Sequence, residues 1–186
     1  MIKRIAMVMS LAMSDMAFVG ASEDAQVVSG EQLFRTAGGY GCATCHGLYA
    51  QGGGSVGGNI RGKSIEDIDA SLTNEPTMLL LNDILSAENK QDLARYLEML
   101  GDSQLVEWNI ETESKQSTAT IKKGQQAQLV VVNKSFESVS IDVSGLSPTE
   151  QTLVVAPYET KAVNWQPQVG HYQLGFQDDV INILVE

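Results

Sequence analysis

The sequence predicts a two-domain protein in which a helical domain precedes an all-β domain. Apolar residues between positions 29 and 101 recur with helical spacing, whereas residues 105–186 break into short β-rich segments separated by turn signals. The length of 186 residues also exceeds what one small domain needs. We expect an export signal at 1–21, a helical domain at 22–101 and a β domain at 105–186.

The first residues are typical of a secretory signal. Lys3 and Arg4 precede a mostly apolar run that ends in the small residues Val19-Gly20-Ala21. We predict cleavage after Ala21, export to the periplasm and no stable membrane insertion after processing. An uncleaved membrane anchor is the alternative, although the run is short for a span and is interrupted by Asp15.

Three helices are expected in the helical domain. Ser29-Gly30-Glu31-Gln32 is a capping-box pattern that predicts the start of the first helix. Ser64 is a candidate cap for a second, and Ser86 for a third that ends at Gly101. The third helix carries one apolar face at i, i+3, i+4 and i+7 spacing, made by Leu93, Tyr96, Leu97 and Leu100.

The β domain is predicted as an antiparallel sandwich because about eight short strands follow one another at close spacing. The expected strands lie near Val106–Glu111, Thr118–Ile121, Ala127–Asn133, Val139–Val143, Gln151–Ala156, Ala162–Trp165, His171–Phe176 and Val180–Val185. Asp102-Ser103-Gln104 is expected as a short linker between the two domains.

The only two cysteines of the chain lie in one motif, Cys42-Ala43-Thr44-Cys45-His46. C-x-x-C-H is the pattern of covalent haem attachment, in which two thioethers hold the ring and the next residue binds the iron. A thioredoxin-like pair would need a preceding strand, and a zinc site would need two more ligands. The other histidine, His171, is far away in sequence, and a plain disulfide leaves His46 unexplained.

The motif and the helix order resemble the class I c-type cytochromes. This resemblance implies one covalently attached haem c held by Cys42 and Cys45, with His46 as the proximal ligand. It implies Met78 as the distal ligand, because the family's distal methionine precedes the last helix; Met99 is expected in the core. The Gly58 carbonyl is expected to accept a hydrogen bond from His46.

The same resemblance implies that the first and last helices cross through Gly30, Phe34 and Tyr96. Arg61 and Lys63 are candidates for pairing with haem propionates, although solvated loop cations are the commoner case.

The β half resembles the cupredoxins. The resemblance lies in the segments Ile121–Gln125, Leu129–Asn133, Ala156–Lys161 and Val169–Tyr172. A blue-copper site needs two histidines and a cysteine, whereas this half has His171 alone and neither cysteine nor methionine. We therefore predict no copper, and a scaffold or docking role for this domain.

The charge of the chain argues against nucleic acid and anionic membrane surfaces as partners. Without Lys3, Arg4 and Asp15 of the signal, 22 acidic and 10 basic side chains remain, a formal charge of −12. This charge favours a basic redox partner protein, and an acidic surface that serves only solubility is an equal alternative.

These observations predict an exported monohaem cytochrome that carries one electron and is not an enzyme. No catalytic triad, carboxylate pair or phosphate-binding loop stands out in the sequence. Two alternatives stay open: an electron-accepting subunit of a larger periplasmic oxidoreductase, and a haem sensor with an open distal face.

Overall fold

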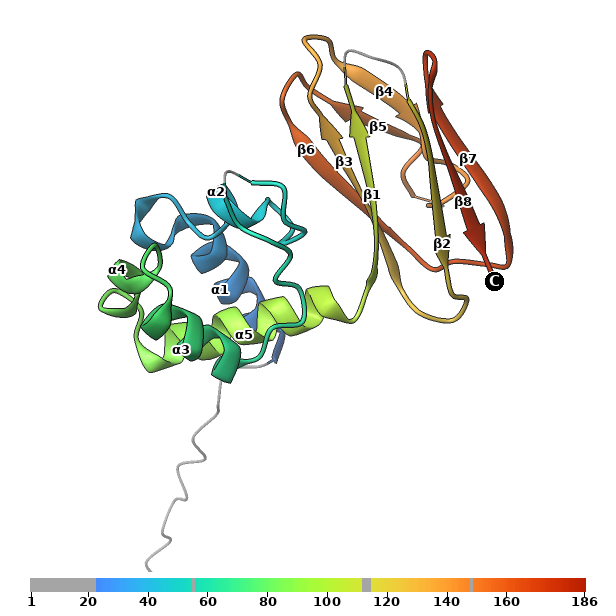
Figure 1. Ribbon diagram of the computed structural model, residues 1–186. Coiled ribbons are helices and arrows are strands. Elements are labelled where there is room, and N and C mark those ends of the chain that lie inside the picture. Colours follow the sequence, from blue (N-terminus) through green and yellow to red (C-terminus); the bar gives the residue numbers. More distant parts are fainter. Residues whose placement is uncertain (1–22, 55, 112–114, 148) are drawn as a thin grey trace, which may run out of the picture.

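The protein consists of a helical unit followed by a β unit, in the order that the sequence predicts (Figure 1). The structure, a computed structural model, describes residues 23–54, 56–111, 115–147 and 149–186. The predicted export signal at 1–21 lies outside the described residues.

Five α-helices and a short 3-10 turn make up the described part of the helical unit. They are α1 (Glu23–Thr36), the 3-10 turn (Ala37–Gly39), α2 (Ala43–His46), α3 (Ile65–Asn74), α4 (Leu79–Asn82) and α5 (Ala87–Gly101). Ser64 and Ser86 each close a capping box at the start of α3 and α5, as predicted. The predicted start of the first helix at Ser29 is wrong: α1 begins at Glu23 and runs straight through Ser29.

The helical unit is built around the crossing of α1 and α5. A methyl group at Gly30 would lie 2.0 Å from the backbone oxygen of Asp92, so only glycine lets the two backbones approach this closely. One turn later, the rings of Phe34 and Tyr96 meet at 5.5 Å between centroids, and both are fully or almost fully buried. The predicted packing of these three residues is confirmed.

Eight strands form the described part of the β unit, and each predicted segment overlaps one of them. They are β1 (Gln104–Ile110), β2 (Gln116–Ile121), β3 (Ala127–Asn133), β4 (Val139–Asp142), β5 (Thr152–Val155), β6 (Thr160–Trp165), β7 (Gly170–Phe176) and β8 (Asp179–Val185). They pair in the orders β1-β3-β6, β2-β8-β7 and β4-β5 around one apolar core.

The prediction of a purely antiparallel sandwich is wrong. β1 pairs with β3 in parallel, and β2 pairs with β8 in parallel, while the other pairs are antiparallel. The reason is the path of the chain: after β1 it crosses to the opposite sheet to form β2 and then returns as β3. Two consecutive crossings leave β1 and β3 running in the same direction.

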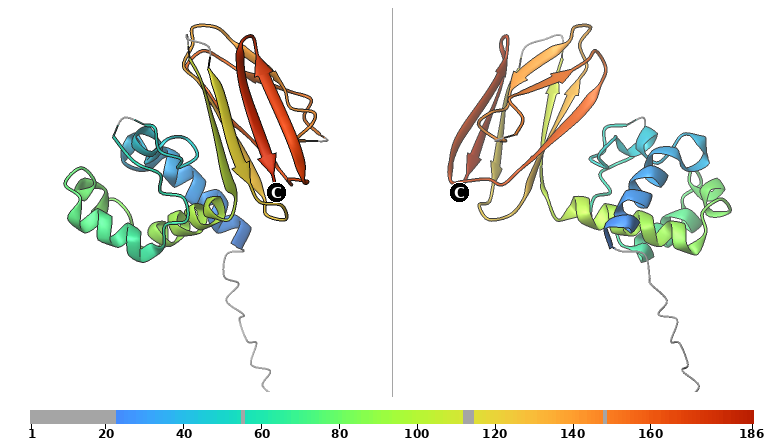
Figure 2. Two further views of the ribbon diagram at one scale, coloured as in Figure 1. Left: turned by 45° about the vertical axis from the view of Figure 1, so that its right-hand side comes forward. Right: turned by 180° about the vertical axis from the view of Figure 1, so that it is seen from behind.

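The two units have separate apolar cores and are joined directly by the chain. One core contains buried residues between Phe34 and Leu100, and the other contains buried residues between Val106 and Val185. The end of α5 leads into β1 at Gln104 with almost no linker, and the further views show the same two bodies side by side (Figure 2).

Candidate functional site

The Cys-x-x-Cys-His motif folds as one turn of helix, α2, that begins after Cys42. The backbone N–H groups of Cys45 and His46 both donate to the Cys42 carbonyl, at 3.1 and 2.9 Å. A left-handed glycine, Gly47 with a φ of 79°, then ends the turn. The motif therefore presents two thiols and an imidazole from a single compact turn.

The glycine-rich segment after the motif wraps around it. Gly52 N donates to the His46 carbonyl at 2.7 Å, and Gly57 N donates to the Cys45 carbonyl at 2.8 Å. A methyl group at Gly57 would lie 2.5 Å from His46 Nδ1 and 2.6 Å from the Cys45 oxygen. A side chain at Gly57 would therefore push this segment off the motif.

His46 is oriented by the carbonyl of Gly58. His46 Nδ1 lies 2.9 Å from the Gly58 oxygen, as the sequence predicts. Because a carbonyl only accepts, the proton of the neutral ring must reside on Nδ1, which leaves the lone pair of Nε2 available to a metal. This arrangement is the usual support for an imidazole ligand.

Met78 and the motif line the same cavity. A cavity of about 280 Å³ is lined by Cys42, Cys45, His46 and Met78, together with Val56 and Leu81. A second hollow of about 100 Å³ touches His46 and Met78 again and adds Ile60, Ile68 and Leu97. All four predicted site residues are therefore brought to one apolar cavity, although His46 and Met78 are 32 positions apart.

The remaining candidate ligands lie elsewhere. Met99, expected in the core, is 40% exposed on α5 because it points away from the face that packs on α1. His171 is an exposed residue of β7, as the sequence predicts.

Burial makes the Cys42 thiol a poor nucleophile. Desolvation raises the pKa of Cys42 to about 11, so the thiol stays protonated at neutral pH. Reactive cysteines of dithiol redox enzymes have lowered pKa values instead. The site is therefore unlike that of a thioredoxin-type enzyme.

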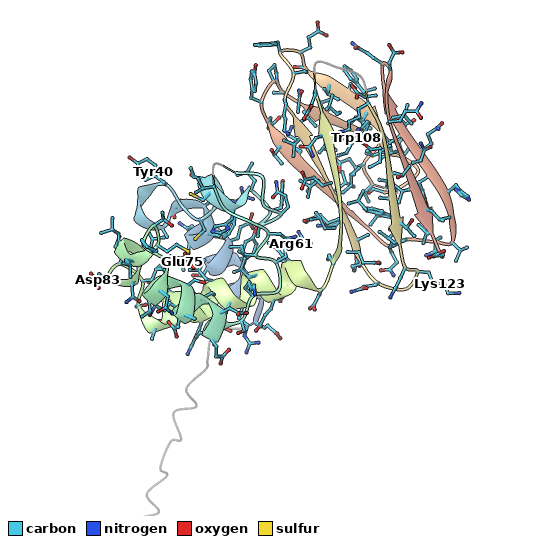
Figure 3. The ribbon with its side chains drawn as sticks, viewed as in Figure 1. Tyr40, Arg61, Glu75, Asp83, Trp108 and Lys123 are labelled. Carbon is cyan, nitrogen blue, oxygen red and sulfur yellow. The ribbon has the colours of Figure 1, made fainter. Side chains whose placement is uncertain are left out.

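The two loop cations near the site differ from each other. Lys63 is exposed and pairs with Asp67 at 3.6 Å, one turn into α3. Arg61 turns away from solvent toward the β unit, which the sequence did not indicate (Figure 3). The sequence predicts Arg61 as a propionate partner or a solvated cation. The structure shows neither, because the guanidinium donates four hydrogen bonds to protein oxygens.

A groove between the two units is a further feature that the sequence did not predict. It has a volume of about 890 Å³ and is lined on one side by Tyr40, Thr44 and the glycines that follow the motif. Lys134, Tyr158 and Glu159 of the β unit line the other side. No local pattern could have revealed it, because it exists only where two separately folded units meet.

Two features are absent from the described residues. Within them, no group of three or more His, Cys, Asp or Glu side chains is placed to hold a metal ion. None of the helices in this part of the chain has the length and apolar character of a membrane span.

Among the comparisons with known proteins, only that with solved structures gives matches. No protein-family model matches the chain, and no curated protein matches it. The apo form of a copper-binding protein is similar to 46% of this chain and 89% of its own, with 16% identity and a TM-score of 0.35.

Two other solved structures are similar over 45% of this chain. The metal-binding domain of the Cu(I)-exporting P-type ATPase CopA of Streptococcus pneumoniae is covered over 97% of its length, with 12% identity and a TM-score of 0.31. A reduced Cu(I) form of an amicyanin variant is covered over 82%, with 13% identity and a TM-score of 0.31.

The cofactor prediction is corrected in one respect. It names one haem c and excludes copper, whereas the similar structures are those of copper-binding proteins. The exclusion of copper is withdrawn on the chemistry of the donors in the helical unit. It rested on the ligands of the β half alone, and the donors gathered in the helical unit are two thiols, an imidazole and a thioether, which are types that suit copper as well as haem iron.

Proposed function

We propose that this protein is an exported one-electron carrier of the c-type cytochrome class. Cys42 and Cys45 would attach the haem, His46 would be the proximal ligand and Met78 the distal ligand. The observation that carries the proposal is the meeting of these four side chains at one apolar cavity, with His46 held by the Gly58 carbonyl. Haem in such a site supplies a one-electron iron centre whose potential follows from its axial ligands and its burial.

The residues of the chain have simple tasks in this function. Gly58 orients the imidazole so that Nε2 is free to bind, and Leu81 of the larger cavity and Ile60 and Ile68 of the smaller hollow give the site apolar walls. An imidazole held in this way keeps the structural change on electron transfer small. No acid, base or nucleophile is required, so we propose an electron-transfer protein and not an enzyme.

The chemical nature of the partner follows from charge. The full chain has a formal charge of −11, and Glu75 lies at the wall of the cavity itself. We propose a redox partner protein with a basic docking surface, met in the periplasm after removal of residues 1–21. N-terminal sequencing of the mature protein checks the export step.

The experiment is the maturation of the full chain in a bacterial host that attaches haem c to exported proteins. We expect a coloured protein with a pyridine haemochrome of thioether-linked haem, and an intact mass above that of the processed polypeptide. The double variant Cys42→Ser, Cys45→Ser should lose both, whereas His171→Ala should keep both. Copper is measured in the same sample, and a colourless protein with stoichiometric copper would overturn the proposal.

The groove between the units favours a second candidate, an electron-accepting subunit of a larger oxidoreductase. A groove of about 890 Å³ beside the motif offers a place for a segment of a partner protein. Purification of the tagged protein from its own cells tests this: a stoichiometric partner supports the subunit, and an isolated coloured monomer supports the free carrier.

A further inference from the structure

The side chain of Arg61 connects the helical unit to the β unit. Its Nη1 donates to Gln128 Oε1 of β3 at 2.6 Å and to the Tyr49 carbonyl at 3.2 Å. Its Nη2 donates to the carbonyls of Leu100 and Ser103 at the end of α5. One guanidinium thus joins the segment after the motif, the last helix and the β sheet. Figure 3 shows Arg61 between the two units.

The position of Arg61 is costly for a charged group. Burial lowers the pKa of the Arg61 guanidinium, and all four of its acceptors are neutral oxygens. A cation removed from water without a carboxylate partner gives up hydration that neutral acceptors replace only in part. A surface lysine would serve solubility equally well, so the arrangement points to a role in positioning.

The segment next to Arg61 is the one that holds His46. Gly58, whose carbonyl faces His46 Nδ1, lies three residues before Arg61. The Asn59 side chain accepts from Arg61 N at 2.9 Å, and Gly62 N donates to the Leu97 carbonyl at 2.7 Å. Few free torsions therefore remain between the anchored guanidinium and the Gly58 carbonyl.

The acceptor on the β unit is itself fixed. Gln128 is only 5% exposed, and its Nε2 donates to Asn164 Oδ1 of β6 at 2.8 Å. This bond directs Oε1 of Gln128 toward Arg61. The sheet therefore presents an oriented acceptor, and the position of the Gly58 segment depends on where the β unit lies.

We propose that Arg61 is a positioning residue through which the β unit holds the Gly58 carbonyl on His46. The proposal rests on the proposed function for its redox consequence. A carbonyl that accepts firmly from Nδ1 makes the imidazole a stronger donor and favours the oxidised state of a bound iron. A loosened β unit therefore weakens this bond and makes reduction of the iron easier.

The test uses the matured full chain and three variants. Arg61→Lys keeps the charge and loses the branched donor. Gln128→Leu removes the β acceptor together with the donor to Asn164, and Gln128→Glu restores an acceptor for Arg61. Lys123→Met, at an exposed cation of the β unit, is the control for loop charge. Gln173→Leu is the control for a cross-strand amide, because Gln173 Nε2 donates to Asn182 Oδ1 at 2.9 Å on the other sheet.

Two measurements are made on each variant: exchange of the His46 Nδ1 proton with water by ¹⁵N-edited NMR, and the equilibrium of reduction against a reference dye. In Arg61→Lys and Gln128→Leu we expect exchange about three- to tenfold faster, as for the loss of one net hydrogen bond. We also expect the reduction equilibrium to move toward the reduced state. Both controls should behave as the wild type. Gln128→Glu keeps an acceptor for Arg61 but loses the donor to Asn164, so it should lie between Gln128→Leu and the wild type.

Unchanged exchange and unchanged reduction in Arg61→Lys and Gln128→Leu, even with a lower melting temperature, would overturn the proposal, because Arg61 would then be only structural. A colourless protein would be a different failure, that of the proposed function. The His46 ¹⁵N measurement does not need haem, so in that case it still decides whether Arg61 positions the ring.

Discussion

Gly57 lies against the ring of His46 so closely that a methyl group in its place would come within 2.5 Å of Nδ1. The next residue, Gly58, has open space around the same position and provides the carbonyl that faces Nδ1. Neither glycine has a positive φ. The two adjacent glycines therefore differ in whether an added methyl group has room: Gly57 has none, and Gly58 has open space.

Gly57→Ala should displace the imidazole, whereas Gly58→Ala should be tolerated. An added methyl that overlaps a ring and a backbone oxygen costs about 1–3 kcal/mol of stability. We expect Gly57→Ala to lower the melting temperature and to speed the exchange of the His46 Nδ1 proton with water. Equal behaviour of the two variants in these measurements would contradict the packing described for the site.

Met78→Ala should change the coordination of a bound haem iron. With the thioether removed, the reduced protein should pass from a low-spin six-coordinate to a high-spin spectrum and bind carbon monoxide rapidly. Met99→Ala is the matched control, since Met99 is a 40% exposed methionine of α5 outside the cavity. A low-spin spectrum in Met78→Ala would show that another group is the distal ligand.

Tyr96 should make the stability of the helical unit fall at alkaline pH. Burial, helped by the charge of Glu31, raises the pKa of the Tyr96 phenol to about 12. Because the folded state favours the neutral phenol, its contribution is complete below pH 10 and is lost as pH rises from 10 toward 12.

We expect a loss of about 1–2 kcal/mol across this interval, from a shift of roughly 1.4 kcal/mol per pKa unit with allowance for solvent screening. Denaturant unfolding at pH 9 and pH 11.5 measures it. Tyr96→Phe should lack this part of the pH dependence, and Tyr158→Phe, at a 63% exposed position, should retain it. The same slope in wild type and Tyr96→Phe would refute the assignment.

Asn133 should be among the most sensitive positions of the β unit. It is fully buried, and its Nδ2 donates to the carbonyls of Glu137, Val155 and Ala156 at 2.8–3.1 Å. Asn133→Ala leaves these carbonyls unpaired in the turns after β3 and β5, at a cost of about 2–4 kcal/mol.

Urea unfolding followed by tryptophan fluorescence measures this loss, because Trp108 and Trp165 are both buried in the same core. Asn109→Ala is the control, since that amide donates only to the half-exposed Glu107 side chain at 2.7 Å. Similar midpoints for the two variants would contradict the structural role of Asn133.

Periodicity and local chemistry in the sequence predicted most elements of the fold. Ser64 and Ser86 mark helix starts by hydrogen bonds three residues away, and alternation along Val139, Ile141 and Val143 marks a strand. The first helix was predicted too short because a second plausible cap, Ser29, lies inside it. The direction of the β1–β3 and β2–β8 pairs was predicted wrongly, because apolar and polar side chains alternate in the same way along parallel and antiparallel strands.

What the sequence determined by itself is the chemistry that adjacent residues share: the thiol pair beside an imidazole, the caps, the turns and the apolar faces. The tertiary structure decided everything that depends on residues far apart in the chain. It brought Met78 to the cavity of His46, turned Arg61 toward Gln128, and placed Met99 outside the core. The physical reason is that spacing along the chain fixes only local contacts, whereas a meeting of distant side chains depends on how whole elements pack.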